Sequence, residues 1–99
     1  MSNDPVLQAR RIIVTGVVQG VGYRWSMVQK AQRLGLVGWV QNHRDGSVEA
    51  LAQGNNEALV ALIAWSRIGP AAAQVNHVHV EHESHTEDTL KDFIQRATT

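Results

Sequence analysis

The spacing of hydrophobic residues along the chain predicts an alternation of strands and helices. Runs rich in β-branched residues, and runs in which apolar and polar residues alternate, are typical of strands. The predicted strands cover residues 11–18, 36–42, 47–53 and 75–83. Apolar residues recur at helical spacing over residues 23–34, and again between the asparagines at 55–56 and the Ile-Gly-Pro at 68–70. The pattern therefore predicts the order β-α-β-β-α-β.

This order predicts an α+β, ferredoxin-like βαββαβ sandwich, in which two helices cover one face of an antiparallel sheet. A short apolar segment at residues 93–94 is a candidate fifth strand, so we expect four to five strands. In the first helix, Trp25, Val28 and Ala31 are predicted to share the buried face. Because this fold hosts many unrelated functions, it does not by itself predict an activity.

Composition narrows the class of protein. A chain of 99 residues has room for one domain, which we expect at residues 11–99 behind a flexible tail at residues 1–10. Nine basic and nine acidic residues cancel, which argues against a general nucleic-acid or membrane-surface binder. No stretch is long and apolar enough to span a bilayer. The absence of cysteine excludes disulfides and thiolate chemistry, and it favours a cytoplasmic location.

The most informative stretch is residues 16–24, Gly-Val-Val-Gln-Gly-Val-Gly-Tyr-Arg, which leads from the first strand into the first helix. Glycines allow successive amides to turn toward one point, and a helix N-terminus adds free N–H groups and partial positive charge. The Arg24 guanidinium matches phosphate oxygens, so the stretch is a candidate phosphate site. On spacing alone, the alternative is an ordinary turn followed by a solvated arginine. The stretch is neither a Walker A loop nor a dinucleotide fingerprint.

Two parts of the chain resemble the signatures of a known family. The first is residues 16–24, and the second is the Gly-Trp-Val-Gln-Asn of residues 38–42 with the downstream Gly, Val and Gly at 46, 48 and 54. Both are similar to the acylphosphatase signatures, and the Gly-Pro-Ala at residues 69–71 also resembles that family. The resemblance covers residues 11–94, with two long motifs in the right order and at the right spacing.

The resemblance implies a monomeric hydrolase, without metal or cofactor, that cleaves small acyl phosphates and is inhibited by its product, inorganic phosphate. The residue-by-residue match to the signatures implies that Arg24 holds the phosphoryl group and that Asn42 orients the attacking water. The backbone amides that bind phosphate are those of Gln19, Gly20, Val21, Gly22, Tyr23 and Arg24. Without the resemblance, Asn42 is better explained as a turn asparagine that bonds its own hairpin. Since no general base stands near either motif, we expect a phosphate oxygen to accept the water proton.

Other functions stay open at this point. One is a non-catalytic module that senses anions, and another is a stand-alone relative of the acylphosphatase-like domain of carbamoyl-transfer proteins. His77, His79 and Glu81 have the alternation of a zinc site, but a solvated sheet face explains that spacing better. The three tryptophans are predicted to lie in or beside the core rather than to act as stacking platforms.

Overall fold

The order of elements predicted from the sequence is confirmed. The computed structural model describes residues 7–84, 86–87 and 89–99. Its elements are β1 (Gln8–Val17), α1 (Tyr23–Arg33), β2 (Val37–Asn42), β3 (Val48–Gly54), α2 (Asn56–Ser66), β4 (Gln74–Glu83) and β5 (Phe93–Gln95). Because β1 begins at Gln8, residues 8–10 of the expected tail belong to the sheet. Residues 1–6 of that tail lie outside the described residues.

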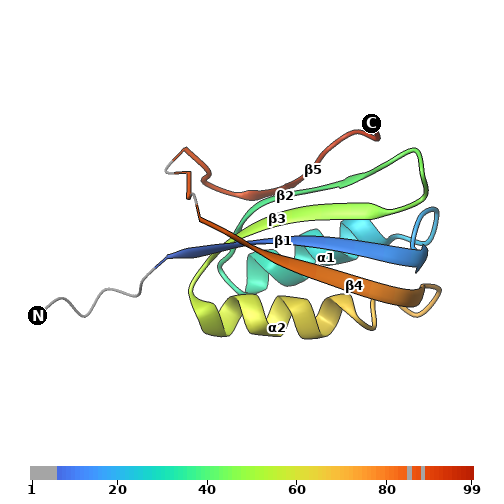
Figure 1. Cartoon of the computed structure of the whole chain (residues 1–99), viewed down its shortest axis with the longest axis horizontal. Coiled ribbons are helices and arrows are strands. Elements are labelled where there is room, and N and C mark those ends of the chain that lie inside the picture. The colour runs from blue at the N-terminus through green and yellow to red at the C-terminus, as the bar shows by residue number, and fades with distance from the viewer. Residues whose placement is uncertain (1–6, 85, 88) are drawn as a thin grey trace, which may run out of the picture.

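The strands form one five-stranded sheet in the order β4-β1-β3-β2-β5. β1 pairs antiparallel with β3 and β4, and β2 pairs antiparallel with β3, but β5 lies parallel to β2. The expectation of an antiparallel sheet therefore holds for the first four strands only. β4 runs opposite to β2, so a chain that reverses direction after β4 returns parallel to β2 at the far edge (Figure 1).

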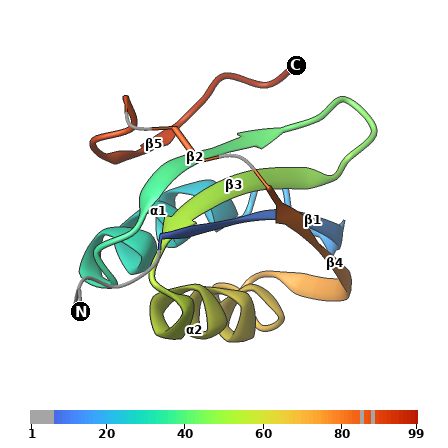
Figure 2. The ribbon, with the colours of Figure 1, turned by 60° about the vertical axis from the view of Figure 1, so that its left-hand side comes forward.

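Both helices pack against the same face of the sheet, as Figure 2 also shows, and the core lies between them and the strands. Successive side chains of a strand point to opposite faces, so alternate residues such as Ile12 and Val14 are fully buried. α2 adds Leu59 and Leu62 to this core. No described helix has the length and apolar character needed to cross a bilayer.

The buried face of α1 differs from the predicted one. Its buried residues are Tyr23, Met27 and Ala31, which follow one another at intervals of four, and Trp25 is 64% exposed. Residues four apart share one side of a helix, so burial of Tyr23 turns the side chain two positions later away from the core. The prediction that Trp25 lies in the buried stripe is therefore wrong.

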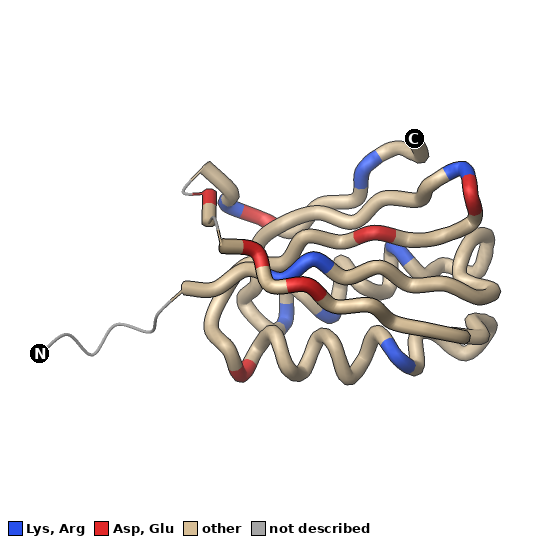
Figure 3. The backbone as a smooth tube through the Cα atoms, viewed as in Figure 1, with Lys and Arg blue, Asp and Glu red and all other residues tan. Residues whose placement is uncertain are grey.

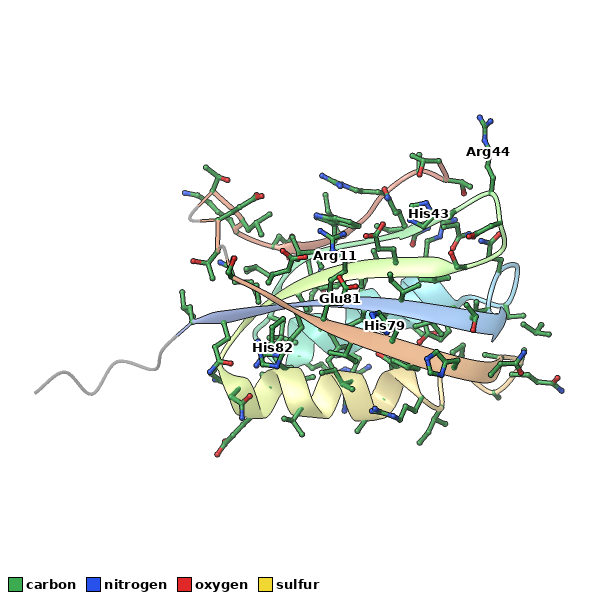
Figure 4. The ribbon with its side chains drawn as sticks, viewed as in Figure 1. Arg11, His43, Arg44, His79, Glu81 and His82 are labelled. Carbon is green, nitrogen blue, oxygen red and sulfur yellow. The ribbon has the colours of Figure 1, made fainter. Side chains whose placement is uncertain are left out.

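The face of the sheet opposite the helices carries charged residues of both signs. Arg11 of β1 bonds Glu49 of β3, and its Nε lies 2.8 Å from Glu83 Oε1 of β4. Figure 3 shows blue and red segments interspersed along the chain, and Figure 4 shows Arg11 and Glu81 over the middle of the sheet. Neither sign dominates, which agrees with the formal net charge of zero.

Candidate active site

The loop after β1, the start of α1 and the C-terminal end of β2 meet at one end of the sheet, on the right in Figure 1. β1 and β2 run in the same direction with β3 between them, so their C-terminal ends lie at the same edge. Gln19 ties the loop to this edge, since its Nε2 donates to the backbone oxygens of His43 at 2.7 Å and Ser47 at 2.9 Å. A side chain therefore holds the glycine loop against the β2–β3 turn.

The N-terminus of α1 has free backbone amides. Its N-cap, Gly22, has a φ of 78° and provides no side-chain cap, whereas Asn55 Oδ1 caps α2 by accepting from the Ala58 N–H at 2.8 Å. Gly20 is also left-handed, with a φ of 74°, a conformation that glycine adopts without strain. No backbone N–H of residues 20–25 donates to another described residue, and the first turn of α1 has no acidic side chain. This helix end is therefore suited to an anion.

Tyr23 anchors the start of α1 to the core. Its side chain is 1% exposed, its hydroxyl donates to the Ser66 backbone oxygen at 2.8 Å, and its ring centroid lies 5.3 Å from that of Trp65. A Cβ at Gly69 would lie 2.8 Å from Tyr23 Cε2, so this loop needs glycine to pack on the ring. Burial raises the pKa of the Tyr23 hydroxyl, which therefore stays neutral and acts as an anchor.

Arg24 extends from the first turn of α1 to the segment after β5. Its Nη1 donates to the Arg96 backbone oxygen at 2.7 Å. That segment is fixed in turn, because the Arg96 N–H donates to the Val40 oxygen of β2 at 2.8 Å. A guanidinium has five N–H donors, so one bond orients the group and leaves the other donors for a ligand.

Asn42 lies at the end of β2 and is 8% exposed. Among the described residues, its Oδ1 is the buried side-chain polar atom without a hydrogen-bond partner. Other groups bond the adjacent turn, where Asp45 Oδ1 accepts from the Ser47 N–H at 2.9 Å and from its hydroxyl at 2.6 Å. The alternative in which Asn42 bonds its own hairpin is therefore contradicted. A buried amide oxygen without a protein partner is costly, so it needs a hydrogen-bond donor such as a water or a ligand.

A cavity of about 140 Å³ brings these groups together. Its lining residues are Val18, Gly20, Gly22, Tyr23, Arg24, Trp25, Asn42 and Gln95. Arg24 is the charged side chain among them. A larger and more open hollow, of about 460 Å³, lies beside His43 and Glu49 and reaches neither Arg24 nor Asn42. We assign the site to the smaller cavity because the free amides, the guanidinium and the free amide oxygen meet there.

His43 follows Asn42 in the sequence, but its ring is bonded outside the cavity. His43 Nε2 lies 2.6 Å from Glu49 Oε1, and Nδ1 lies 3.3 Å from Thr99 Oγ1. Burial raises the pKa of Glu49, but hydrogen bonds from His43 and Arg11 and the Arg11 charge outweigh it and hold that pKa below its usual range. No carboxylate or imidazole of a described residue lines the cavity, so the described lining provides no general base.

The histidines of β4 do not form a metal site with their described neighbours. His79 Nε2 lies 3.0 Å from Glu81 Oε1, and both side chains are about half exposed (Figure 4). Among residues 7–84, 86–87 and 89–99, no group of three or more potential ligands is placed to hold a metal ion. The interpretation of these residues as a solvated face is therefore the better supported one.

Comparison with known proteins identifies the family. The family model described as Acylphosphatase matches residues 10–94. The chain belongs to the acylphosphatase family. A curated acylphosphatase of Bifidobacterium longum is 47% identical over 93 residues, which are 94% of this chain and 96% of that protein. A curated acylphosphatase of an Acidovorax species is 54% identical over 80 residues, which are 81% of this chain and 82% of that protein.

Solved structures agree with this acylphosphatase assignment. The acylphosphatase from Coxiella burnetii has a TM-score of 0.85 and 36% identity, and the match covers 91% of this chain and 93% of that one. Full-length HypF, in a phosphate- and nucleotide-bound form, has a TM-score of 0.86 and 27% identity. That match covers 99% of this chain but 13% of the HypF chain. The fold therefore occurs both as most of a small protein and as a small part of a larger one.

The structure brings together most residues that the acylphosphatase resemblance predicts for the site. Arg24 and Asn42 line the same cavity, together with loop residues 20 and 22–23. The side chains of Gln19 and Val21 do not line it; Gln19 holds the loop in place, and Val21 packs against the core. The sequence does not predict three lining residues, namely Val18, Trp25 and Gln95. Gln95 is two positions after the core residue Phe93, which suggests a shared face, but no local signal places β5 beside β2.

Proposed function

We propose that this member of the acylphosphatase family hydrolyses acyl phosphates to a carboxylate and inorganic phosphate by direct attack of water. One observation carries the proposal. Arg24, with donors free for a phosphoryl group, and Asn42, with an amide oxygen free for a water, line a single small cavity. A site that only binds phosphate needs the Arg24 donors. The Asn42 amide oxygen adds a place for the attacking water.

In this proposal the phosphoryl group lies between the backbone amides of residues 19–24 and the Arg24 guanidinium. The glycine conformations and the uncapped start of α1 support this placement, since they leave the N–H groups available. Negative charge spreads over the phosphoryl oxygens in the transition state. Donors already held in position by the Arg96 carbonyl and the Tyr23 anchor stabilise that charge without further reorganisation.

The Asn42 amide orients the water, with Oδ1 accepting one of its hydrogens. The water oxygen forms a bond to phosphorus, and the bond from phosphorus to the acyl oxygen breaks, with both electrons leaving on the carboxylate. Asn42 is neutral and cannot take the proton, and no carboxylate or imidazole of a described residue lines the cavity. A phosphoryl oxygen therefore accepts it, and the products are a carboxylate and inorganic phosphate.

The proposal also covers the cofactor requirement, the oligomeric state, the cellular location and the inhibition of the protein. The amides and Arg24 supply the positive charge that this reaction needs, so we propose catalysis that is independent of metal and cofactor by a monomer in the cytoplasm. Inorganic phosphate, as product, competes for the same donors and inhibits. Neither nucleic acid nor a membrane is a partner in this proposal, in keeping with the balanced charge. Gel filtration, cell fractionation and phosphate inhibition test these parts separately.

Two candidates from other classes remain to be tested against this one. An anion-sensing module would keep the phosphate site but would have no use for the free Asn42 oxygen. A stand-alone relative of a domain from a larger protein is favoured by the match to a small part of HypF. The nearly full-length match to the Bifidobacterium longum acylphosphatase supports the hydrolase instead.

The deciding experiment is hydrolysis of benzoyl phosphate by the purified protein in excess EDTA, followed in the ultraviolet. We expect turnover in EDTA and a loss on the order of 1,000-fold or more in Arg24→Ala. The matched control is Arg33→Ala. Arg33 is an exposed arginine in the last turn of the same helix, so we expect this variant to keep wild-type activity. A folded wild-type protein that binds phosphate without turnover would support the anion-sensing module and overturn the hydrolase.

A further inference from the structure

The candidate cavity is too small to enclose a whole acyl phosphate with a large acyl group. Its volume of about 140 Å³ is less than half of the roughly 300 Å³ at the lower end for pockets that enclose drug-sized ligands. A phosphoryl group held by the loop amides and Arg24 occupies the interior. The acyl group therefore extends to the rim, and the rim residues decide which acyl groups are bound well.

Trp25 is the first of two rim residues that no part of the proposed hydrolysis uses. It lines the cavity and is 64% exposed, whereas tryptophans are on average largely buried. The other two tryptophans have partners for their rings, since Trp65 packs on Tyr23 and Trp39 lies under the Arg96 guanidinium at 4.3 Å. Among the described residues, Trp25 has neither an aromatic nor a cationic partner. Its ring is therefore available to stack on a planar group.

Gln95 is the second such residue. It lies on β5 opposite Val40 of β2, which places it on the edge strand next to the end that carries Asn42. Gln95 lines the cavity, and it shares a face of β5 with Phe93, since the two residues are two positions apart on one strand. An amide offers both donors and an acceptor, and it is neutral, so it can bond a carbonyl oxygen without repelling the carboxylate that leaves.

We infer that Trp25 and Gln95 form a subsite for the acyl group, in which the Trp25 ring stacks on a planar, conjugated acyl group and the Gln95 amide donates to its carbonyl oxygen. This inference rests on the proposed function. The subsite selects aromatic acyl phosphates over small aliphatic ones, because a methyl group presents no face to the indole. Gln95 contacts the oxygen that all acyl phosphates share, so it raises affinity without distinguishing between them.

The test compares kcat/KM for benzoyl phosphate and acetyl phosphate in wild type, Trp25→Ala and Trp25→Phe. Stacking between aromatic groups is worth about a three- to tenfold effect, so Trp25→Ala should lower the benzoyl-to-acetyl ratio by about that factor. Trp25→Phe keeps an aromatic face and should restore most of the ratio. The matched control, Val60→Ala, removes an exposed apolar side chain of α2 outside the cavity and should leave the ratio unchanged.

Gln95→Leu provides the second arm of the test. We expect it to raise KM for both substrates by a similar factor and to leave the ratio of kcat/KM values unchanged.

An equal loss for both substrates in Trp25→Ala, or no loss for either, would overturn the stacking role. A Gln95→Leu protein with wild-type KM values would overturn the contact to the carbonyl oxygen. Wild type that hydrolyses neither substrate would overturn the proposed function, and this inference with it, whereas an unchanged ratio in an active Trp25→Ala protein would overturn the inference alone.

Discussion

The cavity at the end of the sheet and the charged network on its open face use similar polar groups in opposite ways. On the open face, Arg11 bonds both Glu49 and Glu83, so the positive charge lies between two negative ones. In the cavity, the Asn42 amide oxygen is buried without a partner, and Arg24 uses one donor on a backbone carbonyl. The same contrast separates the two helices, since an asparagine caps α2 and no side chain caps α1.

This difference separates stability from function. Polar groups that satisfy one another stabilise the fold and have little left to offer a ligand. Polar groups that the fold leaves free reduce stability until something binds, and for that reason they mark a site. We therefore expect substitutions in the cavity to change turnover more than stability, and substitutions in the open-face network to do the reverse.

The largest expected effect is that of Arg24→Lys. Arg24→Lys replaces a planar fork with a point charge, which cannot bond the Arg96 carbonyl and a phosphoryl group at once in the same geometry. We expect kcat/KM for benzoyl phosphate to fall on the order of 1,000-fold, with weaker inhibition by phosphate. Arg33→Lys, on the same helix, is the matched control. Near-normal activity in Arg24→Lys would show that charge alone is sufficient.

Asn42→Ala should give the next largest effect. We expect kcat to fall about 100-fold, because the water loses the group that orients it, while competitive inhibition by phosphate stays close to wild type. The free energy of unfolding should change by less than about 1 kcal/mol, since Oδ1 has no hydrogen bond to lose. Steady-state kinetics and urea unfolding of the same preparation give both values. Unchanged kcat would contradict the water-orienting role.

Glu49→Gln tests the charged network on the open face of the sheet. Because the folded protein holds the pKa of Glu49 below the ordinary value of 4.5, its stabilisation is complete above that pH and is lost as the pH falls through the folded pKa. We expect a loss of about 1–2 kcal/mol at pH 7 with little change in kcat, and a smaller difference from wild type below pH 4.5.

Urea unfolding at a series of pH values measures this effect. Glu81→Gln is the matched control, because its carboxylate pairs with His79 at the exposed surface and should contribute little. A difference between wild type and Glu49→Gln that stays constant down to pH 3 would refute the linkage.

The smallest expected effect is that of His79→Ala. Its pair with Glu81 is about half exposed on both sides, so we expect stability within about 0.5 kcal/mol of wild type and unchanged turnover. Metal analysis of protein purified without a His tag should find no stoichiometric zinc in either form. Zinc that is bound by wild type and lost in His79→Ala would restore the metal hypothesis for β4.

The sequence by itself determined the order of the elements and the residues at the centre of the candidate site. The strand and helix periods are local properties of the chain, and so is the glycine-rich turn that leads into Arg24. Two motifs at the right spacing identified the family and singled out Asn42, which local turn chemistry alone would have explained otherwise. The same local reasoning failed for Trp25, because the burial of Tyr23 sets which side of α1 faces the core.

Tertiary structure alone decided what surrounds those residues. Arg24 meets the Arg96 carbonyl across 72 positions of sequence, and β5 reaches β2 only after the chain has crossed from the opposite edge of the sheet. That crossing makes the β2–β5 pair parallel and brings Gln95 to the cavity. Residue patterns report the preferences of near neighbours, whereas these contacts depend on which surfaces pack together once the core has formed. The free oxygen of Asn42 belongs to this second class, since only the packed structure shows which polar groups remain without a partner.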